Sequence, residues 1–335
     1  MKVLLTGATG YLGEAIAREG AARGHEVRGL CRAIPEAQQR IAHVEYVAGD
    51  LLEPGSIRAA CDGCDAVIHC AGLVSIWRPN PNDFYRINID AARDLIQTAF
   101  GQGAQRVVYT SSFFALGPTD ATLADETWLN DRIEPPTHYA RSKTAADRIV
   151  RAMMEQGRNL VTVYPGVIYG PGRRTQGNHI TKLIENFCQR KIPGVIGPAD
   201  RRWTFSYIDD VAQGHWLALE QGRAGERYIL GGQDASQLEL YAMLAELSGA
   251  PAPHWQIPAA FACLVALVEE GKARLLGATP RLTRESLRAY SHHWRFTSHK
   301  AVTELGYTRT PLKIGLQKTL DALGYAPPED RSTLL

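Results

Sequence analysis

The stretch that decides the fold lies at the start of the chain, where residues 1–31 read MKVLLTGATGYLGEAIAREGAARGHEVRGLC. Val3–Leu5 is a short β-rich run. Glu14–Arg23 has helical character and ends at Gly24, and Val27–Cys31 reads as the next strand. A strand, a glycine-rich turn, a helix and a second strand within about thirty residues predict the opening βαβ unit of a dinucleotide-binding fold.

Three glycines separate the first predicted strand from the first predicted helix: Gly7, Gly10 and Gly13, in the pattern G-x-x-G-x-x-G. Because glycine has no side chain, backbone N–H groups in such a turn can approach a pyrophosphate at the helix N-terminus. An ordinary turn before a helix could share the spacing, so the prediction depends on the βαβ context. We expect the cofactor to contact Gly7, Thr9, Gly10, Tyr11, Leu12 and Gly13.

The alternation of strands and helices continues through the first half of the chain. Strand-like runs follow at Val44–Val47, Ala66–His69, Arg106–Thr110 and Leu160–Tyr164, and helical patterns at Ile57–Ala60, Phe84–Gln102 and Tyr139–Gln156. This repetition predicts an α/β fold with a Rossmann-type doubly wound parallel sheet.

The regular pattern fades after Pro165, where Pro, Gly and Arg become enriched in residues 166–177 and 193–202. We therefore expect a dinucleotide-binding domain over residues 1–165 and a smaller, mostly helical substrate-binding portion over residues 166–335. Arg227–Leu230 again looks like a strand and is predicted to rejoin the first sheet.

Composition limits the possible partners and surroundings. The 37 basic and 35 acidic residues give a net charge of +2 without a long basic block, which argues against nucleic-acid binding. The longest apolar run, Ile257–Val268, is shorter than the roughly 18 residues of a membrane span and indicates a core helix or a substrate-facing lid. The chain opens directly on a strand pattern, so we expect a cytoplasmic protein with reduced thiols. Cys61 and Cys64 form a C-x-x-C without a second ligand pair, and no metal is expected.

The end of the second strand indicates which cofactor is used. An NAD-binding protein usually offers Asp or Glu to the adenine ribose there, whereas this chain has Leu30, Cys31 and Arg32. A guanidinium suits a 2′-phosphate, and Arg28 and Arg40 could supply further donors. We therefore expect NADP(H) rather than NAD; the alternative is that these are solvated surface arginines.

Two sets of carboxylates have both a functional and a structural interpretation. Asp50 and Leu51 close the third strand, where a carboxylate can accept a bond from the adenine amino group or cap the next helix. Asp209 and Asp210 could form an acid/base pair, but their place before the helical stretch Val211–Leu219 favours helix capping.

A phenol, an ammonium and a hydroxyl form the candidate catalytic set. Tyr139 and Lys143 are four residues apart in a helical segment, so both project from one face. An ammonium beside a phenol lowers the phenol's pKa from about 10, which would make Tyr139 a competent proton donor or acceptor. Ser111 and Ser112 follow the strand Arg106–Thr110 at the edge where ligands of doubly wound sheets bind, so a hydroxyl there can polarise a carbonyl.

In this order, the glycine turn, Thr110-Ser111-Ser112 and Tyr139-x-x-x-Lys143 resemble the extended short-chain dehydrogenase/reductase family, within the NAD-dependent epimerase/dehydratase superfamily. The likeness covers almost the whole chain, because it continues in His69–Gly72, Asn88, Tyr164–Pro171 and Phe205–Ala212.

Three branches of this family are similar to parts of the chain. Val27–Arg32 looks like the NADPH-using dihydroflavonol reductase branch, and Ala301–Pro311 is similar to hopanoid-associated sugar epimerase-like proteins. The 3-beta-hydroxysteroid dehydrogenases are a neighbouring branch. Ala33 is a departure, because the reductase branch often has Asp at that place.

The resemblance implies roles for individual residues. Ser112 would be the catalytic hydroxyl, Tyr139 the general acid/base and Lys143 the residue that orients the nicotinamide ribose, while Ser111 would be mainly structural. The cofactor would further be bordered by Ala71, Gly72, Pro165, Gly166 and Val167.

The resemblance also implies an activity: reversible reduction of a ketone or aldehyde by hydride transfer from the nicotinamide of NADP(H). The alternative is a nucleotide-sugar epimerase or dehydratase with tightly bound NAD, although the missing acidic residue at position 32 argues against it. A third hypothesis is a non-enzymatic NADP(H) sensor. By the same likeness we expect a homodimer, formed by the helical segments Phe84–Gln102 and Tyr139–Gln156.

The substrate is not named by the sequence, which leaves a steroid, a flavonoid, a lipid-like ketone or a sugar nucleotide open. Four arginines of the second portion could grip an anionic group of a substrate or could be solvated loop residues. They are Arg173, Arg174, Arg201 and Arg202.

Overall fold

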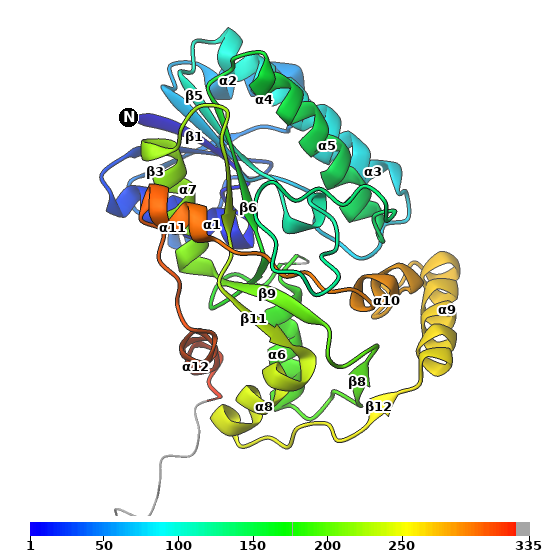
Figure 1. Cartoon of the computed structure of the whole chain (residues 1–335). Coiled ribbons are helices and arrows are strands. Elements are labelled where there is room, and N and C mark those ends of the chain that lie inside the picture. The colour runs from blue at the N-terminus through cyan, green and yellow to red at the C-terminus, as the bar shows by residue number, and fades with distance from the viewer. Residues whose placement is uncertain (176, 326–335) are drawn as a thin grey trace, which may run out of the picture.

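The computed structural model describes residues 1–175 and 177–325, and its centre is a parallel sheet of seven strands (Figure 1). The strand order is β10-β6-β5-β4-β1-β2-β3, and every neighbouring pair is parallel. The strands are β1 (Lys2–Thr6), β2 (Glu26–Cys31), β3 (Val44–Ala48), β4 (Ala66–His69), β5 (Arg106–Thr110), β6 (Leu160–Pro165) and β10 (Arg227–Leu230). The prediction of a Rossmann-type doubly wound sheet is confirmed, with its switch point between β1 and β4, where ligands of such sheets bind.

Helices cover both faces of this sheet. One face carries α1 (Tyr11–Ala22), α7 (Ile208–Gln221) and α11 (His299–Leu305), and the other carries α2 (Pro54–Cys61), α4 (Ala91–Gly101) and α5 (His138–Glu155). The central strands are apolar and buried on both sides, as a covered parallel sheet requires, whereas the edge strand β3 is partly exposed. On the first face Trp216 lies fully buried and its indole Nε1 donates a 2.8 Å hydrogen bond to the carbonyl of Ile16.

The helical segment predicted over Phe84–Gln102 is divided in the structure. It consists of α3 (Asn82–Tyr85), a π-helical turn at Arg86–Asp90 and α4. π-Helical turns often mark functional sites because the extra residue turns a side chain inward. Here the turn contains Asn88, whose amide is buried and fully engaged.

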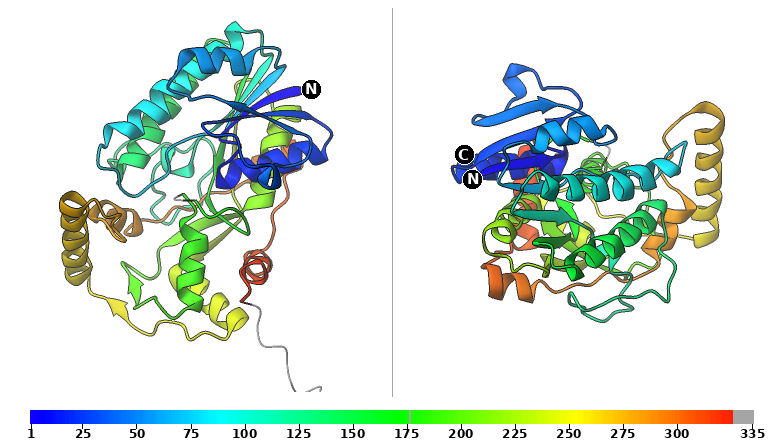
Figure 2. Two further views of the ribbon diagram at one scale, coloured as in Figure 1. Left: turned by 180° about the vertical axis from the view of Figure 1, so that it is seen from behind. Right: turned by 90° about the horizontal axis from the view of Figure 1, so that it is seen from above.

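The residues after β6 contribute both to the large sheet region and to a smaller portion beside it. β10 is a strand of the seven-stranded sheet, and α7 and α11 pack on that sheet. The other elements form the smaller portion beside the carboxyl edge of the sheet (Figures 1 and 2). Its strands are β7 (Val167–Tyr169), β9 (Arg202–Tyr207) and β11 (Gln233–Ser236) in one sheet and β8 (Val195–Ile196) and β12 (Gln256–Ile257) in another. Its helices are α6 (His179–Cys188), α8 (Gln237–Ser248), α9 (Ala259–Leu276), α10 (Arg284–Tyr290) and α12 (Leu312–Ala322).

The apolar run Ile257–Val268 forms the end of β12 and the first half of α9. Figure 2 shows α9 at the outer edge of the smaller portion, away from the central sheet. Among the residues that the structure describes, no helix combines the length and apolar character that crossing a bilayer would need. Two short 3₁₀ turns, Ala37–Gln39 and Phe113–Ala115, complete the secondary structure.

Candidate functional site

The turn between β1 and α1 has the geometry of an anion-binding turn. Gly7 has φ +77°, and its carbonyl accepts a 2.8 Å hydrogen bond from the N–H of Gly10. A Cβ on Gly13 would lie 1.9 Å from the Gly7 oxygen, so only glycine lets α1 start this close to the strand. Gly10 caps α1 without a side-chain acceptor for the first-turn N–H groups, which leaves them available for phosphate.

Two of the residues predicted to meet the cofactor have side chains that belong to the core. The Tyr11 ring is buried, and its hydroxyl donates a 2.8 Å hydrogen bond to the Gly170 carbonyl. Leu12 packs partly buried against the same core. Tyr11 and Leu12 can therefore contact a cofactor only through their backbone atoms. Thr9, the third residue with a side chain among those predicted for the turn, is half-buried.

The segment after β4 lies against the glycine turn. A Cβ on Gly7 would come within 2.9 Å of the Ala71 backbone, and the Ala71 N–H donates to Thr6 Oγ1 at 3.2 Å. A Cβ on Gly72 would lie 3.6 Å from Lys143 Nζ. The fold thus brings the glycine turn, the Ala71–Gly72 segment and Lys143 together, although they are far apart in the chain.

Lys143 is buried in the middle of α5. Its Nζ donates a 2.8 Å hydrogen bond to the carbonyl oxygen of Thr110, the last residue of β5. Burial lowers the pKa of the Lys143 ammonium to about 8, because a charge is disfavoured in a medium of low dielectric.

Tyr139 and Ser112 meet at the carboxyl edge of the sheet. The Ser112 hydroxyl lies close enough to Tyr139 to affect its pKa, and Ser112 Oγ accepts a hydrogen bond from the Phe114 N–H at 3.3 Å. We predicted that Lys143 would lower the pKa of Tyr139. That prediction is wrong for the structure, where burial raises the pKa of Tyr139 to about 12, the Ser112 hydroxyl opposes the rise, and the Lys143 ammonium is held by the β5 carbonyl.

Ser111 faces a different partner from Ser112. Its hydroxyl donates a 3.0 Å hydrogen bond to Asp147 Oδ1, which is buried in α5 one turn after Lys143. Asp147 also pairs with Arg151 at 3.0 Å. Ser111 therefore ties β5 to α5 and is turned away from the Tyr139 hydroxyl.

Asn88 holds the loop after β4 against α5. Its Oδ1 accepts from the Leu73 N–H at 2.7 Å, and its Nδ2 donates to the Leu73 carbonyl at 3.1 Å and to Ser142 Oγ at 2.9 Å. Ser142 in turn donates to the carbonyl of Tyr139 at 2.8 Å. Asn88 was absent from the predicted set of site residues; its sequence signal is a lone amide within an apolar helical pattern.

The arginines expected to bind a 2′-phosphate have different surroundings. Arg32 is exposed just beyond β2 and has no hydrogen bond or ion pair to any described residue. Arg28 is unsuited to a ligand, which corrects the prediction, because it is held by Glu45 at 3.0 Å and by the Asp62 carbonyl at 2.7 Å. Arg40 donates to the Pro35 carbonyl at 2.9 Å.

The predicted carboxylates do not cap helices through their side chains; Asp209 and Asp210 lie in the first turn of α7, and the residue before that helix is Tyr207. Asp50 accepts from the Leu52 N–H at 2.9 Å, so it closes a turn, and the residue that precedes α2 is Glu53. Leu51 packs partly buried on the core. Asp210 accepts two bonds from Thr310, at 2.6 and 2.8 Å, which joins α7 to the segment before α12.

Pro165, Gly166 and Val167 connect β6 of the large sheet with β7 of the small one. A Cβ on Gly166 would lie 2.4 Å from the Thr204 carbonyl, and the Gly166 N–H donates to Ser206 at 3.2 Å. This crossing is therefore fixed tightly against β9, at the same edge of the large sheet as Ser112.

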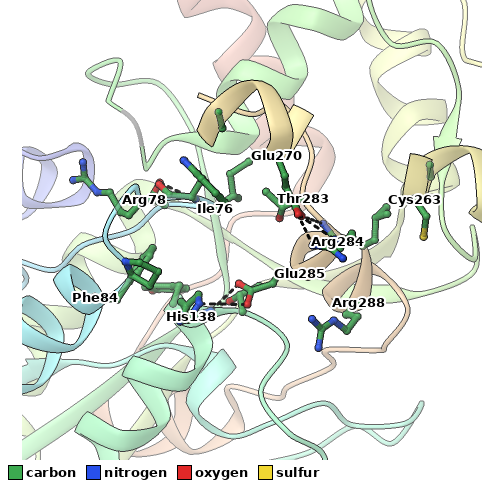
Figure 3. Close-up of a pocket in the computed structure, with 18 of the residues that line it drawn as sticks. Ile76, Arg78, Phe84, His138, Cys263, Glu270, Thr283, Arg284, Glu285 and Arg288 are labelled. Atoms are coloured by element: carbon green, nitrogen blue, oxygen red, sulfur yellow. Dashed lines mark hydrogen bonds and ion pairs between the residues drawn. The ribbon is translucent and has the colours of Figure 1, made fainter. Parts of the chain in front are cut away.

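A cavity of about 1030 Å³ opens beside Tyr139 (Figure 3). Its walls come from the loop of residues 75–81, the start of α5, and the helices α9 and α10. The apolar part of the lining includes Ile76, Trp77, Phe84, Ala262, Ala273 and Leu287. Ala262 belongs to the run Ile257–Val268, which was expected to be a core helix or a substrate-facing lid. The sequence did not indicate the other lining residues, because they come from segments that are far apart in the chain.

The acidic side chains of the cavity are paired. Glu270 accepts two bonds from the Arg284 guanidinium, at 2.8 and 3.0 Å, and Glu285 accepts from the His138 N–H at 3.0 Å (Figure 3). Glu285 also pairs with Arg141 on α5. These bonds hold α10 against the start of α5, next to Tyr139. Arg78, Arg274 and Arg288 also line the cavity, and the rest of its lining is mainly apolar.

Four arginines considered for substrate binding lie outside this lining. Arg174 pairs with Glu185, Arg201 with Asp200 and Arg202 with Glu239. Arg173 forms only a long hydrogen bond with Gln39. Within the described part of the chain, no three His, Cys, Asp or Glu side chains gather closely enough to hold a metal ion.

Comparisons with known proteins agree with this geometry. The chain is 32% identical over 314 residues to sterol demethylase protein B of Methylococcus capsulatus, covering 92% of this chain and 94% of the relative. It is 30% identical over 262 residues to 2-alkyl-3-oxoalkanoate reductase of Stenotrophomonas maltophilia, covering 75% and 77% of the two chains. The crystal structure of gox2253 superposes with a TM-score of 0.82 at 31% identity and covers 96% of this chain and 97% of that one.

The family model described as the NAD dependent epimerase/dehydratase family matches residues 3–231. This range includes the glycine turn, the Ser112, Tyr139 and Lys143 group, and the strands of the central sheet through β10. The protein belongs to the NAD dependent epimerase/dehydratase family and has the fold of the extended short-chain dehydrogenases/reductases.

Proposed function

We propose that this protein is an NADP(H)-dependent oxidoreductase that reversibly reduces an apolar ketone or aldehyde to an alcohol. The observation that carries the proposal is the placement of Tyr139, which lies near the Ser112 hydroxyl, one helical turn from buried Lys143 and at the wall of a mainly apolar cavity. Relatives named as reductases support carbonyl reduction.

The residues present fit a dinucleotide. The glycine turn leaves no room for a Cβ at Gly13, the first-turn N–H groups of α1 are uncapped, and Arg32 is exposed with an unengaged guanidinium in the described structure. When bound, the nicotinamide would supply or accept the hydride. The turn would hold the pyrophosphate, and Arg32 would meet the 2′-phosphate.

The proton moves through the protein's own side chains. Ser112 donates a hydrogen bond to the substrate oxygen and Tyr139 protonates that oxygen as negative charge develops on it. A Tyr139 hydroxyl with a pKa of about 12 is protonated at neutral pH and is therefore ready to donate. Buried Lys143 lies beside Gly72 and donates to the Thr110 carbonyl, and from this place it would hold the ribose of the nicotinamide.

The Tyr139 assignment is tested by Tyr139→Phe, with NADPH consumption measured over a panel of apolar ketones and aldehydes. We expect a loss of at least about a hundredfold in kcat/KM, the usual contribution of a general acid. Tyr109→Phe is a matched control, because the centroid of the Tyr109 ring lies 5.3 Å from Lys143 Nζ and its buried hydroxyl has no hydrogen-bond partner in the described structure. Equal rates for wild type and Tyr139→Phe would refute the assignment.

The cofactor assignment is tested by Arg32→Asp, which should shift the preference toward NADH by exchanging a phosphate donor for a ribose acceptor. Arg58→Asp makes the same charge change at another exposed site of the same domain and should leave the preference unchanged. An unaltered preference in Arg32→Asp would show that another residue reads the 2′-phosphate.

Stoichiometric NAD retained in purified protein, with no NADPH turnover, would instead favour a redox-neutral epimerase or dehydratase. For assembly, α4 and α5 lie side by side on one face of the sheet (Figure 1), and we propose that they form a homodimer interface. A monomer in light scattering would contradict that interface.

A further inference from the structure

The outer face of α9 exposes large apolar side chains. Seven of the fifteen large hydrophobic residues that are exposed in the described structure lie between positions 255 and 276. Leu275 is 86% exposed and Leu276 78%. The others are Trp255, Phe261, Leu264, Leu267 and Val268. Elsewhere such residues are scattered, whereas a concentration of them on one helix marks an interaction surface.

The two sides of α9 have different tasks. Ala262, Ala266, Glu270 and Ala273 are buried and follow each other at helical spacing, and three of these four line the cavity. Phe261, Leu264, Val268 and Leu275 also follow each other at spacings of three, four and seven, on the opposite side. A helix that is apolar all round is normally covered on every side.

The rest of the protein leaves this outer face uncovered. Figures 1 and 2 show α9 at the margin of the molecule, with α10 beside it and no other helix over its outer side. No other helix of the described structure therefore covers the side of α9 that carries Phe261, Leu264, Val268 and Leu275.

The charges around α9 are positive. Residues 255–291 contain five basic and three acidic side chains, which accounts for the chain's whole net charge of +2. All three carboxylates are engaged: Glu269 with Lys272, Glu270 with Arg284, and Glu285 with Arg141. The guanidinium groups of exposed Arg281 and Arg288 form no ion pair in the described structure, although the backbone N–H of Arg281 donates to Glu269 at 3.1 Å.

We propose that the outer face of α9 docks on a phospholipid bilayer that contains anionic lipids, with the helix lying in the plane of the interface. Phe, Leu and Trp side chains with neighbouring Lys and Arg are the composition of interfacial helices. A second copy of this chain fits less well, because two such segments would bring like charges together. The lack of a membrane-spanning helix in the described residues agrees with surface binding.

This orientation has a consequence that rests on the proposed function. The inner side of α9 is a wall of the cavity beside Tyr139. Docking would therefore place the cavity wall at the bilayer surface, where an apolar ketone concentrates, so that substrate enters the cavity from the lipid.

Vesicle co-flotation of the full chain tests the docking. The vesicles are phosphatidylcholine alone, or phosphatidylcholine with about one third phosphatidylglycerol. We expect flotation with the anionic vesicles, reduced at high salt because screening weakens the lysine and arginine contribution. The double variant Leu264→Glu/Val268→Glu should weaken partitioning at least about tenfold, since it places charges in the apolar face.

The matched control is Ile314→Glu, on α12, where the isoleucine is 52% exposed compared with 57% for Leu264. It should float as the wild type does. Each variant is checked for correct folding by its turnover of a small water-soluble ketone. If no turnover is found, a thermal melt serves as the folding check.

Docking and catalysis fail in distinguishable ways. Equal flotation of the wild type and the double variant, or no flotation of either, would overturn the docking. The docking would also be overturned if the wild type bound no vesicles but self-associated, and the double variant abolished that self-association. Loss of activity in Tyr139→Phe leaves flotation unchanged, and a wild type that floats but reduces no ketone would refute the proposed function alone.

Discussion

Replacement of Lys143 by methionine should make the protein more stable and less active. The Lys143 ammonium is buried, and its pKa is lowered from the ordinary value of 10.5 to about 8. Each pH unit of such a difference corresponds to about 1.36 kcal/mol, so the buried charge costs about 3 kcal/mol at neutral pH. The variant also loses the hydrogen bond to the Thr110 carbonyl, which lowers its free energy of unfolding by about 1 kcal/mol. The net gain in the free energy of unfolding is therefore about 2 kcal/mol.

The pH dependence gives this prediction a second check. Below about pH 8 the lysine is charged in both the folded and the unfolded protein, so its full cost is present. Between about pH 8 and 10.5 the folded protein has lost this proton while the unfolded chain keeps it, so wild-type stability rises with pH relative to the variant. The advantage of Lys143→Met should therefore shrink over this range.

The assay is urea unfolding of cofactor-free protein, followed by circular dichroism at pH 7 and pH 9, with thermal melts in parallel. A gain of about 2 kcal/mol corresponds to about 4 °C at this size. Lys182→Met removes an exposed lysine of α6 and should change stability by less than about 0.5 kcal/mol. If Lys143→Met is less stable than wild type at pH 7, the reasoning about the cost of the buried ammonium is refuted.

Three further substitutions test the packing of the fold and of the loop after β4. Gly20→Ala should lower the free energy of unfolding in urea by about 1 to 3 kcal/mol, because the new Cβ would lie 2.0 Å from the Trp216 ring. Gly271→Ala is the control: this glycine lies in a helix with open space around it, so the substitution should raise the free energy of unfolding by about 0.5 to 1 kcal/mol. Equal effects of the two substitutions would contradict the packing argument. Asn88→Ala should lower the free energy of unfolding by about 2 to 4 kcal/mol, because it leaves the N–H and the carbonyl of Leu73 without their side-chain partner. It should also lower kcat, because the loop after β4 becomes less firmly held. A melting temperature equal to that of the wild type would refute this role of Asn88.

The central sheet was predictable because its strands are defined by local pattern. Ala66–His69 and Arg106–Thr110 are buried on both faces, so each appears in the sequence as an apolar run followed by a turn. Gly13 was also predictable, because only glycine tolerates a helix start 1.9 Å from a carbonyl oxygen. Tyr139 and Lys143 lie on one helix, so their spacing determines that they share a face.

Tertiary structure alone decided what surrounds these groups. The partner of Arg28 is Glu45 on the neighbouring strand, and the pKa of Tyr139 follows from burial, which depends on chain segments far from α5. Ala262 of the cavity wall and exposed Leu264 and Val268 belong to one apolar run, Ile257–Val268, whose two sides differ only in what the folded chain covers. Sequence periodicity determines which residues share a face, whereas burial, charge pairing and pKa depend on contacts between distant segments, and these exist only in the folded protein.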